Sequence, residues 1–184
     1  LVGVGIACAV AGLVVGTLSM ADLTGKISSG MFTLAGGSYA LTLLVATVVI
    51  ILLGMGMPTP AVYALSAVLA APALLALKIE LLPAHLFIVY FASMSAITPP
   101  VAVAAFAAAS IARANPIAVA FIACRVGIVA FVLPLVFVSQ PGLLLMGDAP
   151  TVVTTIGFVL MGAMCLVIAF EGWLFGLVAT PLRA

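Results

Sequence analysis

Charged residues are nearly absent from this 184-residue chain, which has five Lys and Arg, four Asp and Glu, and one His. They make up 5% of the sequence, against roughly 25% in soluble domains. So few charges cannot cover a water-facing surface. Hydrophobic residues account for 67%, and the mean hydropathy is +1.57. A net charge of +1 offers no basic surface, which excludes nucleic acid as a partner. The composition predicts an integral membrane protein embedded in a lipid bilayer.

Clustered metal ligands and paired cysteines are also lacking. Cys8, Cys124 and Cys165 lie far apart, each in an apolar segment, so we interpret them as packing residues. His85 follows Pro83 in a polar turn without a second ligand nearby, and we expect it to be a solvated loop residue. No combination of His, Glu and Cys offers a nucleophile or a metal site. We therefore expect no enzyme activity and no bound cofactor.

Long uncharged segments divide the chain into units that can cross a membrane, for which a helix needs about 20 apolar residues. They lack the polar–apolar alternation of membrane β-strands, so we expect an all-α, multispanning bundle. Asp22 and Lys26 mark an expected loop over 22–37. The predicted elements of a single permease domain over 1–184 are a span at about 1–21, a hairpin at 38–77, a broken helix at 85–112, and spans at 117–138 and 151–177.

Two compact interruptions fall inside charge-free runs. Gly54, Gly56, Pro58 and Pro60 lie within seven residues, and Thr98-Pro99-Pro100 follows about forty residues later. Proline lacks an N–H, and glycine admits left-handed backbone conformations, so helix should stop and restart there. Each cluster could simply be a kink. However, irregular backbone at membrane depth survives only inside protein or beside a water-filled cavity, and Gly/Pro-broken segments point to a transporter binding site.

The candidate ion- and substrate-binding residues lie at these interruptions: Gly54, Gly56, Pro58, Thr59, Ser95, Thr98, Pro99 and Pro100. Freed carbonyls and the hydroxyls of Thr59 and Thr98 could replace the water shell of Na⁺, and we name these two threonines as candidate metal ligands. Helix N-termini after the prolines could face an anionic group. No Asp or Glu is near, which disfavours a proton relay. Each hydroxyl could instead bond to the carbonyl four residues earlier.

The few charges inside or beside the spans have interfacial interpretations. Arg125 has two possible partners, a substrate carboxylate or the lipid headgroups, and its place near the start of a span favours the headgroups. Arg113 and Arg183 lie at span ends, where they would anchor the cytoplasmic interface. Glu171 is expected at the interface beside Trp173.

At these residues the chain resembles a known family, the large permease subunit of TRAP (tripartite ATP-independent periplasmic) transporters. The similarity is closest to the fused permeases that are paired with TAXI-type binding proteins. It covers nearly the whole chain, and its motifs are fairly specific in combination. The runs that carry it are 54–59 (GMGMPT), 95–102 (SAITPPVA), 107–109 (AAA), 112–116 (ARANP) and 170–176 (FEGWLFG).

The resemblance implies Na⁺-coupled symport of an organic acid across a bacterial or archaeal cytoplasmic (inner) membrane, with a soluble periplasmic substrate-binding protein. It implies an elevator-type fold with two inverted repeats, each holding a re-entrant hairpin and a broken helix. By position, 54–59 would be the hairpin tip and 98–100 the break. Alternatives are a non-transporting scaffold subunit, a channel, or a proton-coupled carrier of another family.

Only one such pair is present in this chain, which therefore resembles the second repeat, the C-terminal half of the family's permease. The expected partners are then an N-terminal half and a small permease subunit or its fused equivalent.

An inverted-repeat transporter builds its site at the interface between the halves. We therefore predict that the chain, purified alone and reconstituted in liposomes, shows no Na⁺-dependent uptake of radiolabelled organic acids. Robust uptake would mean that two copies complete the site together or that the family resemblance is misleading.

Overall fold

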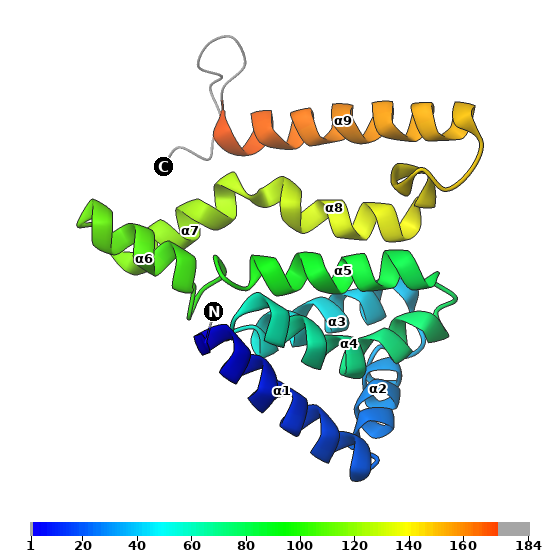
Figure 1. Cartoon of the computed structure of the whole chain (residues 1–184). Helices are drawn as coiled ribbons and strands as arrows, with labels where there is room; N and C mark the ends of the chain where they lie inside the picture. The colour runs from blue at the N-terminus through cyan, green and yellow to red at the C-terminus, as the bar shows by residue number, and fades with distance from the viewer. Residues whose placement is uncertain (1, 173–184) are drawn as a thin grey trace.

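The computed structural model describes residues 2–172, and every regular element within them is helical (Figure 1). This confirms the all-α prediction. In chain order the elements are α1 (Val2–Met20), α2 (Leu23–Leu34), α3 (Tyr39–Leu53), α4 (Thr59–Ala76), α5 (Leu81–Met94), α6 (Val103–Ala112), α7 (Pro116–Val126), α8 (Ile128–Ser139), the short 3₁₀ helix η1 (Pro141–Leu144) and α9 (Ala149–Glu171).

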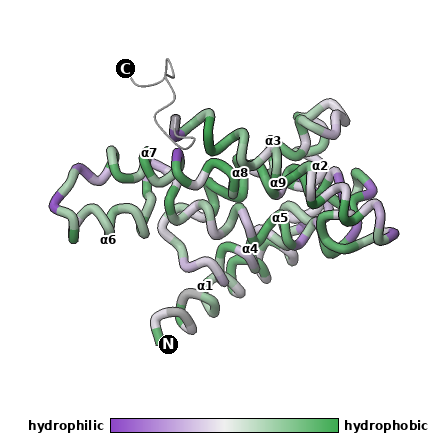
Figure 2. Tube along the Cα trace, turned by 90° about the horizontal axis from the view of Figure 1, so that it is seen from above, coloured by the Kyte–Doolittle hydropathy of each residue, from purple (hydrophilic) through white to green (hydrophobic). Residues whose placement is uncertain are grey.

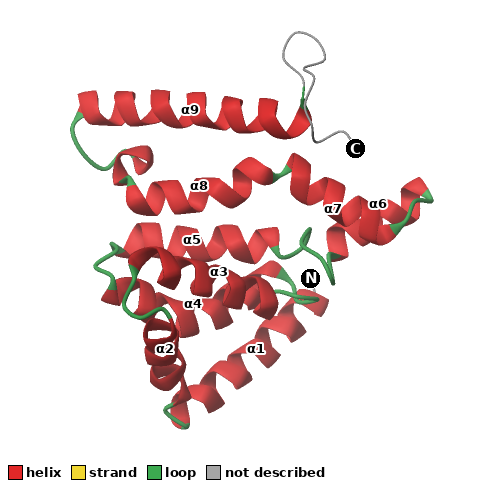
Figure 3. Cartoon of the chain, turned by 180° about the vertical axis from the view of Figure 1, so that it is seen from behind, coloured by secondary structure: helices red, strands yellow, loops and turns green. Residues whose placement is uncertain are grey.

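The helices stack in layers, with α9, α8 and α5 side by side and the pair α3 and α4 beneath α5 (Figures 1 and 3). The turns that join α4 to α5 and α8 to α9 lie at one end of this stack. The α3–α4 turn and the α5–α6 connection lie at the other end, and α6 with α7 projects beyond it. Thus the two interruptions that the sequence singled out occupy the same end of the bundle.

The packed core belongs to α3, α4 and α5. Its fully buried side chains include Ile50 of α3, Leu74 of α4, and Phe87 and Phe91 of α5. The two phenylalanine rings meet edge to face with centroids 4.8 Å apart, a favoured aromatic geometry. Phe137 joins this core from α8. Helix α5 is therefore the central element, and the hairpin and α8 are packed against it.

Apolar side chains also cover the outside of the molecule. Green colour dominates the helices in Figure 2, and purple gathers at turns such as the one between α6 and α7. None of the residues of α9 is buried. Such a surface is unsuited to water but suits lipid, as expected for a helical membrane bundle.

Two helices have by themselves the length and composition to cross a bilayer among the described residues, α4 and α9. The number rises to four if two bent pairs are each counted as one span. These pairs are α1 with α2, bent by 81°, and α6 with α7, bent by 118°. Residues 173–177 of the predicted last span, together with Trp173 and Arg183, lie outside the described residues.

The predicted loop at 22–37 is wrong, because most of it forms α2. Asp22 adopts a left-handed conformation that turns the chain after α1. Ile27 and Met31, four residues apart, then share a helix face that packs on the core. The Ser28 hydroxyl donates a 2.6 Å hydrogen bond to the Leu69 carbonyl of α4. Two charges near the start suggested a loop, but this buried face stabilises helix.

The placement of His85 in a solvated turn is also wrong. Helix α5 begins at Leu81, so the expected start at 85 was four residues late and His85 occupies its second turn. Pro83 is tolerated because it lies in the first turn, where an N–H has no helical partner. The half-buried His85 ring places Nδ1 3.0 Å from the Tyr63 hydroxyl of α4. His85 thus links the hairpin to α5.

The segment 117–138 is two helices, α7 and α8, that meet at Gly127. A Cβ on Gly127 would lie 3.0 Å from the Ala123 carbonyl oxygen and 3.3 Å from Cδ1 of Ile97. A side chain here would crowd both atoms, and glycine avoids this. Asn115 caps α7 by accepting hydrogen bonds from the N–H groups of Ile117 and Ala118, and Pro116 begins the helix.

The Arg125 side chain binds the C-terminal end of α9. Its guanidinium donates from Nε, at 2.8 Å, and from Nη2 to the carbonyl oxygen of Phe170 near the end of α9. The Glu171 carboxylate lies 3.9 Å from Nε. A cation at a helix C-terminus binds the unpaired carbonyls and complements the helix dipole. Arg125 therefore fastens the end of α9 to α7.

We predict that Arg125→Gln destabilises the folded protein by about 1–2 kcal/mol, because charge-assisted bonds to Phe170 are lost. The Arg125–Glu171 ion pair adds little to the stability, since both side chains are about 40% exposed. The matched control is Arg113→Gln, at an exposed turn. Thermal unfolding in detergent should show a lower Tm for the first variant only. Equal shifts for the two variants would contradict the fastening role of Arg125.

Candidate functional site: the hairpin tip and the helix break

The hairpin tip connects α3 to α4 through residues 54–58. The Gly54 N–H bonds to the Ile50 carbonyl at 2.9 Å, which ends α3, and Gly56 has a φ of +80°, which glycine adopts without strain. Pro58 is extended and starts α4, with Pro60 in its first turn. The glycines and prolines therefore act as the sequence predicted, ending one helix and starting the next.

The helix break connects α5 to α6 through residues 95–102. Successive turns follow α5, and the Pro99–Pro100 peptide bond is cis. The Ala104 N–H then bonds back to the Ala96 carbonyl at 2.9 Å. A backbone donor at the start of α6 thus pairs with an acceptor from the end of α5, which holds the two helix ends together across the irregular segment.

The tip and the break are in direct contact. The buried Ser95 hydroxyl lies 2.7 Å from the Ala92 carbonyl oxygen and 3.3 Å from the Gly54 carbonyl oxygen. A hydroxyl has one hydrogen and donates it mainly to the nearer acceptor, the Ala92 carbonyl. The contact of Ser95 with Gly54 is therefore chiefly steric. A Cβ on Gly54 would lie 2.2 Å from Ser95 Oγ and 2.4 Å from Ser95 Cβ. Only glycine permits this approach.

Val101, at the other end of the break, also lies near the glycine-rich tip. A Cβ on Gly56 would meet Cγ1 of Val101 at 3.7 Å, an ordinary van der Waals distance. Residues at both ends of the break, Ser95 and Val101, therefore face the tip.

The two threonines that we named as Na⁺ ligands differ in their surroundings. Thr98 is half-buried and donates its hydroxyl hydrogen to the Met94 carbonyl at 2.7 Å. This is the bond to the carbonyl four residues earlier that the sequence left open as an alternative. Thr59 is the half-buried first residue of α4 and follows the extended Pro58. The role of both threonines in ion binding stays a prediction.

The α7–α8 junction also borders the break, which sequence reasoning missed. The Cys124 thiol donates to the Ile97 carbonyl at a sulfur–oxygen distance of 3.4 Å, and the Ile97 side chain lies against Gly127. The sequence does contain a sign of this junction, because Gly127 is the single glycine within the predicted span 117–138. We interpreted Cys124 as a packing residue, and the structure gives its thiol an acceptor as well.

The chemistry of this region is neutral. Its polar atoms are backbone carbonyls and amides and the hydroxyls of Thr59, Ser95 and Thr98, and no charged residue occurs over 27–77 or 86–112. The described residues contain no group of three or more His, Cys, Asp or Glu that could hold a metal ion. Oxygen dipoles of this kind suit a hard cation such as Na⁺ better than a transition metal.

An apolar bundle with a helical hairpin whose tip touches a broken helix is an arrangement typical of membrane transport proteins. The family model of the DctM component of the tripartite ATP-independent periplasmic transporter matches residues 1–152. The chain belongs to this family and is a permease component of a TRAP transporter. Searches of curated proteins and of solved structures found no match.

The Gly54–Ser95 contact generates a test by compensating substitutions. Gly54→Ala should destabilise the protein by about 1–3 kcal/mol, because the new methyl group overlaps Ser95. Ser95→Gly removes the obstructing Cβ, so the double variant should be more stable than the sum of the two single effects predicts. Chemical denaturation in detergent micelles measures the coupling.

The matched control is Gly30→Ala in α2, where an added Cβ meets no atom within 4 Å. This change should be neutral or slightly stabilising, because alanine favours helix over glycine. Strictly additive losses for Gly54→Ala and Ser95→Gly would contradict the contact between tip and break.

Proposed function

We propose that this chain forms the ion-binding half of a Na⁺-coupled permease for organic acids, with Na⁺ held between the hairpin tip and the helix break. A soluble periplasmic binding protein would deliver the substrate, and an N-terminal half with a small permease subunit, or a fused equivalent, would complete the carrier. The TAXI-type subfamily, the elevator-type second repeat and the cytoplasmic membrane of a bacterium or archaeon belong to the same proposal.

The contact of Gly54 with Ser95 is the observation that carries the proposal. Two interruptions about forty residues apart in sequence come together at one end of the bundle. Each exposes polar backbone in an apolar chain, and such backbone is tolerated at membrane depth where it lines a polar cavity or is buried in protein. If the two segments pack on each other around an ion, their backbone is buried in protein and also lines a polar cavity.

The bond from Thr98 to Met94 is compatible with ion binding. The hydroxyl donates its single hydrogen to the carbonyl, and its oxygen keeps two lone pairs that face away from that bond. The carbonyl oxygen of Gly54 makes only long contacts, with the Met57 N–H at 3.4 Å and the Ser95 hydroxyl at 3.3 Å, which an ion could replace. Neutral oxygens of this kind are the ligands by which broken helices of transporters hold Na⁺.

The anionic substrate would be bound by helix N-termini. Helices α4 and α6 both begin at the irregular segments, with 18 and 10 residues respectively. Pro60 has no N–H and that of Ala104 is bonded to Ala96, so the first N–H groups without a helical partner are those of Thr59 and Val103. The helix dipole adds partial positive charge there. Because no Lys or Arg lies in either segment, these dipoles are the groups of this region that could attract a carboxylate.

The proposal is tested by Thr59→Val and Thr98→Val in the complete transporter. Valine keeps the shape of threonine and removes the oxygen. If the hydroxyls are ligands, each change should raise the Na⁺ concentration for half-maximal uptake by about tenfold or more, since one lost ligand interaction of 1.4 kcal/mol corresponds to about a factor of ten. Radiolabelled uptake in proteoliposomes at varied Na⁺ measures this.

Thr33→Val in α2 is the matched control, because the Thr33 hydroxyl makes the same bond, to the Ser29 carbonyl, at an exposed position away from both interruptions. If Thr59 and Thr98 are only structural, their variants should lose thermal stability like any local defect and keep the wild-type Na⁺ dependence. That outcome would exclude both threonines as ligands.

A further inference from the structure

The C-terminal end of α7 supports the helix break from outside. The Cys124 thiol donates to the Ile97 carbonyl at a sulfur–oxygen distance of 3.4 Å. Three residues further on, a Cβ on Gly127 would lie 3.3 Å from Cδ1 of Ile97, so the Ile97 side chain also lies against α7. Positions three residues apart share one side of a helix. One turn of α7 therefore holds both the carbonyl and the side chain of Ile97.

The peptide group that joins Ile97 to Thr98 is held at two points. Its C=O accepts from the Cys124 thiol, and its N–H, which belongs to Thr98, donates to the Ser95 carbonyl at 3.3 Å. Because a peptide group is planar, the two bonds together set its orientation. The bond to Ser95 is long and lies within the break itself. Cys124 thus supplies the restraint that comes from another helix.

The orientation of this peptide group also places the Cα of Thr98. The Thr98 side chain is a neighbour of the Cys124 thiol, and its hydroxyl bonds to the Met94 carbonyl at 2.7 Å. Thr98 is one of the two threonines named as candidate Na⁺ ligands. The thiol therefore borders the candidate ion site without belonging to the hairpin or to the break.

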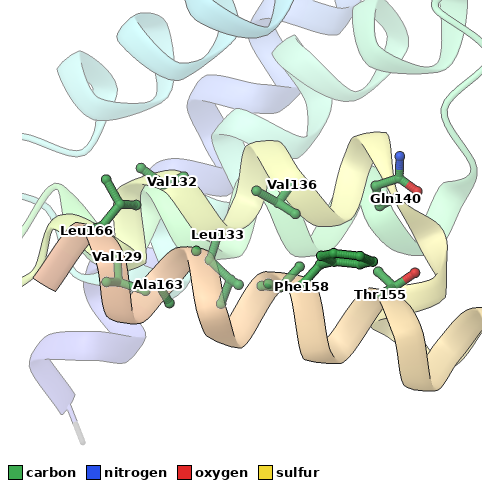
Figure 4. Close-up of a pocket in the computed structure, with 11 residues that line it drawn as sticks. Val129, Val132, Leu133, Val136, Gln140, Thr155, Phe158, Ala163 and Leu166 are labelled. Carbon is green, nitrogen blue, oxygen red and sulfur yellow. The ribbon is translucent and has the colours of Figure 1, made fainter.

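The end of α7 is in turn attached to α9. Arg125, next to Cys124 in sequence, donates from Nε to the Phe170 carbonyl at 2.8 Å. Beyond this bond, the walls that α8 and α9 turn towards each other are largely apolar (Figure 4). The Arg125 bond is a directional attachment, and α9 is long and apolar enough to span a membrane. Cys124 therefore holds Ile97 from a position that α9 fixes.

Loss of the thiol would leave the Ile97 carbonyl without its partner from α7. A carbonyl in apolar surroundings must find another donor, and the peptide group would turn to reach one. The fraction of molecules with the original orientation would then fall. When only a fraction of a protein is competent to bind, the apparent affinity falls by that fraction.

We propose that Cys124 is a positioning residue of the ion site. Its bond to the Ile97 carbonyl holds the Ile97–Thr98 peptide group in the orientation in which the oxygens of the break bind Na⁺. This inference rests on the proposed function, since it concerns the same site, and it adds a residue of α7 to the hairpin tip and the break.

Na⁺-dependent uptake by the complete transporter in proteoliposomes tests the proposal, with Cys124→Ala and Cys124→Ser as paired variants. Alanine removes the donor, whereas serine replaces the thiol by a hydroxyl that can donate to the same carbonyl. Cys8→Ala is the matched control, because it removes the half-buried thiol of α1. Thermal unfolding of each variant checks that it folds.

Cys124→Ala should raise the Na⁺ concentration for half-maximal uptake by about threefold or more, since one hydrogen bond contributes on the order of a factor of two to ten. Cys124→Ser and Cys8→Ala should keep the wild-type value. If Cys124 matters only for folding, Cys124→Ala should have a lower Tm and an unchanged Na⁺ dependence, which would overturn the proposal. An equal rise for the serine and alanine variants would overturn it too, because the donor would then not matter.

These outcomes presuppose a wild-type transporter whose uptake depends on Na⁺. Uptake by the wild type that is the same in Na⁺ and in K⁺ would overturn the proposed function and this inference with it. An unchanged Na⁺ dependence of Cys124→Ala beside a Na⁺-dependent wild type would overturn the positioning role alone.

Discussion

Backbone groups without a partner are the constraint on which this structure depends. In a bilayer no water is available to bond a free N–H or C=O, so each helix end must find a partner inside the protein. At the break, the Ala96 carbonyl accepts from Ala104 and the Ile97 carbonyl accepts from Cys124. The irregular segment therefore exists because α6 and α7 return to bond it, and the local fold follows from that requirement.

The same constraint explains why the tip and the break lie together. Packing two irregular segments against each other shields both from lipid, and this requires that their backbones approach closely. Glycine at position 54 permits the approach, since the space for its Cβ is taken by Ser95. On the other side Gly127 leaves room for Ile97. The break is thus enclosed between the hairpin and the α7–α8 junction.

The sequence predicted what depends on composition and on local backbone chemistry. Low charge and long apolar runs indicated membrane helices, and Gly54, Pro58, Pro99 and Pro100 marked the places where helices end. Tertiary contacts determined the rest. Helix α2 forms because Met31 and Ser28 pack on α4, and His85 is helical and paired with Tyr63. Arg125 takes a partner 45 residues away that no local pattern shows. Local sequence patterns cannot assign ligands at the site either, because the ligands would come from segments that only the tertiary fold brings together.

The neutral chemistry of the region has a consequence for coupling. A site made of charged side chains attracts its ion strongly even when its parts are separated, because Coulomb attraction acts over many ångströms. Dipoles of carbonyls and hydroxyls act over a shorter range. In the proposed site, oxygens from the tip and the break would therefore bind a cation strongly only while the two are together. The steric contact of Gly54 with Ser95 maintains that geometry. Displacing the hairpin would then weaken cation binding without any change of charge, and cation binding would in turn hold the hairpin in place.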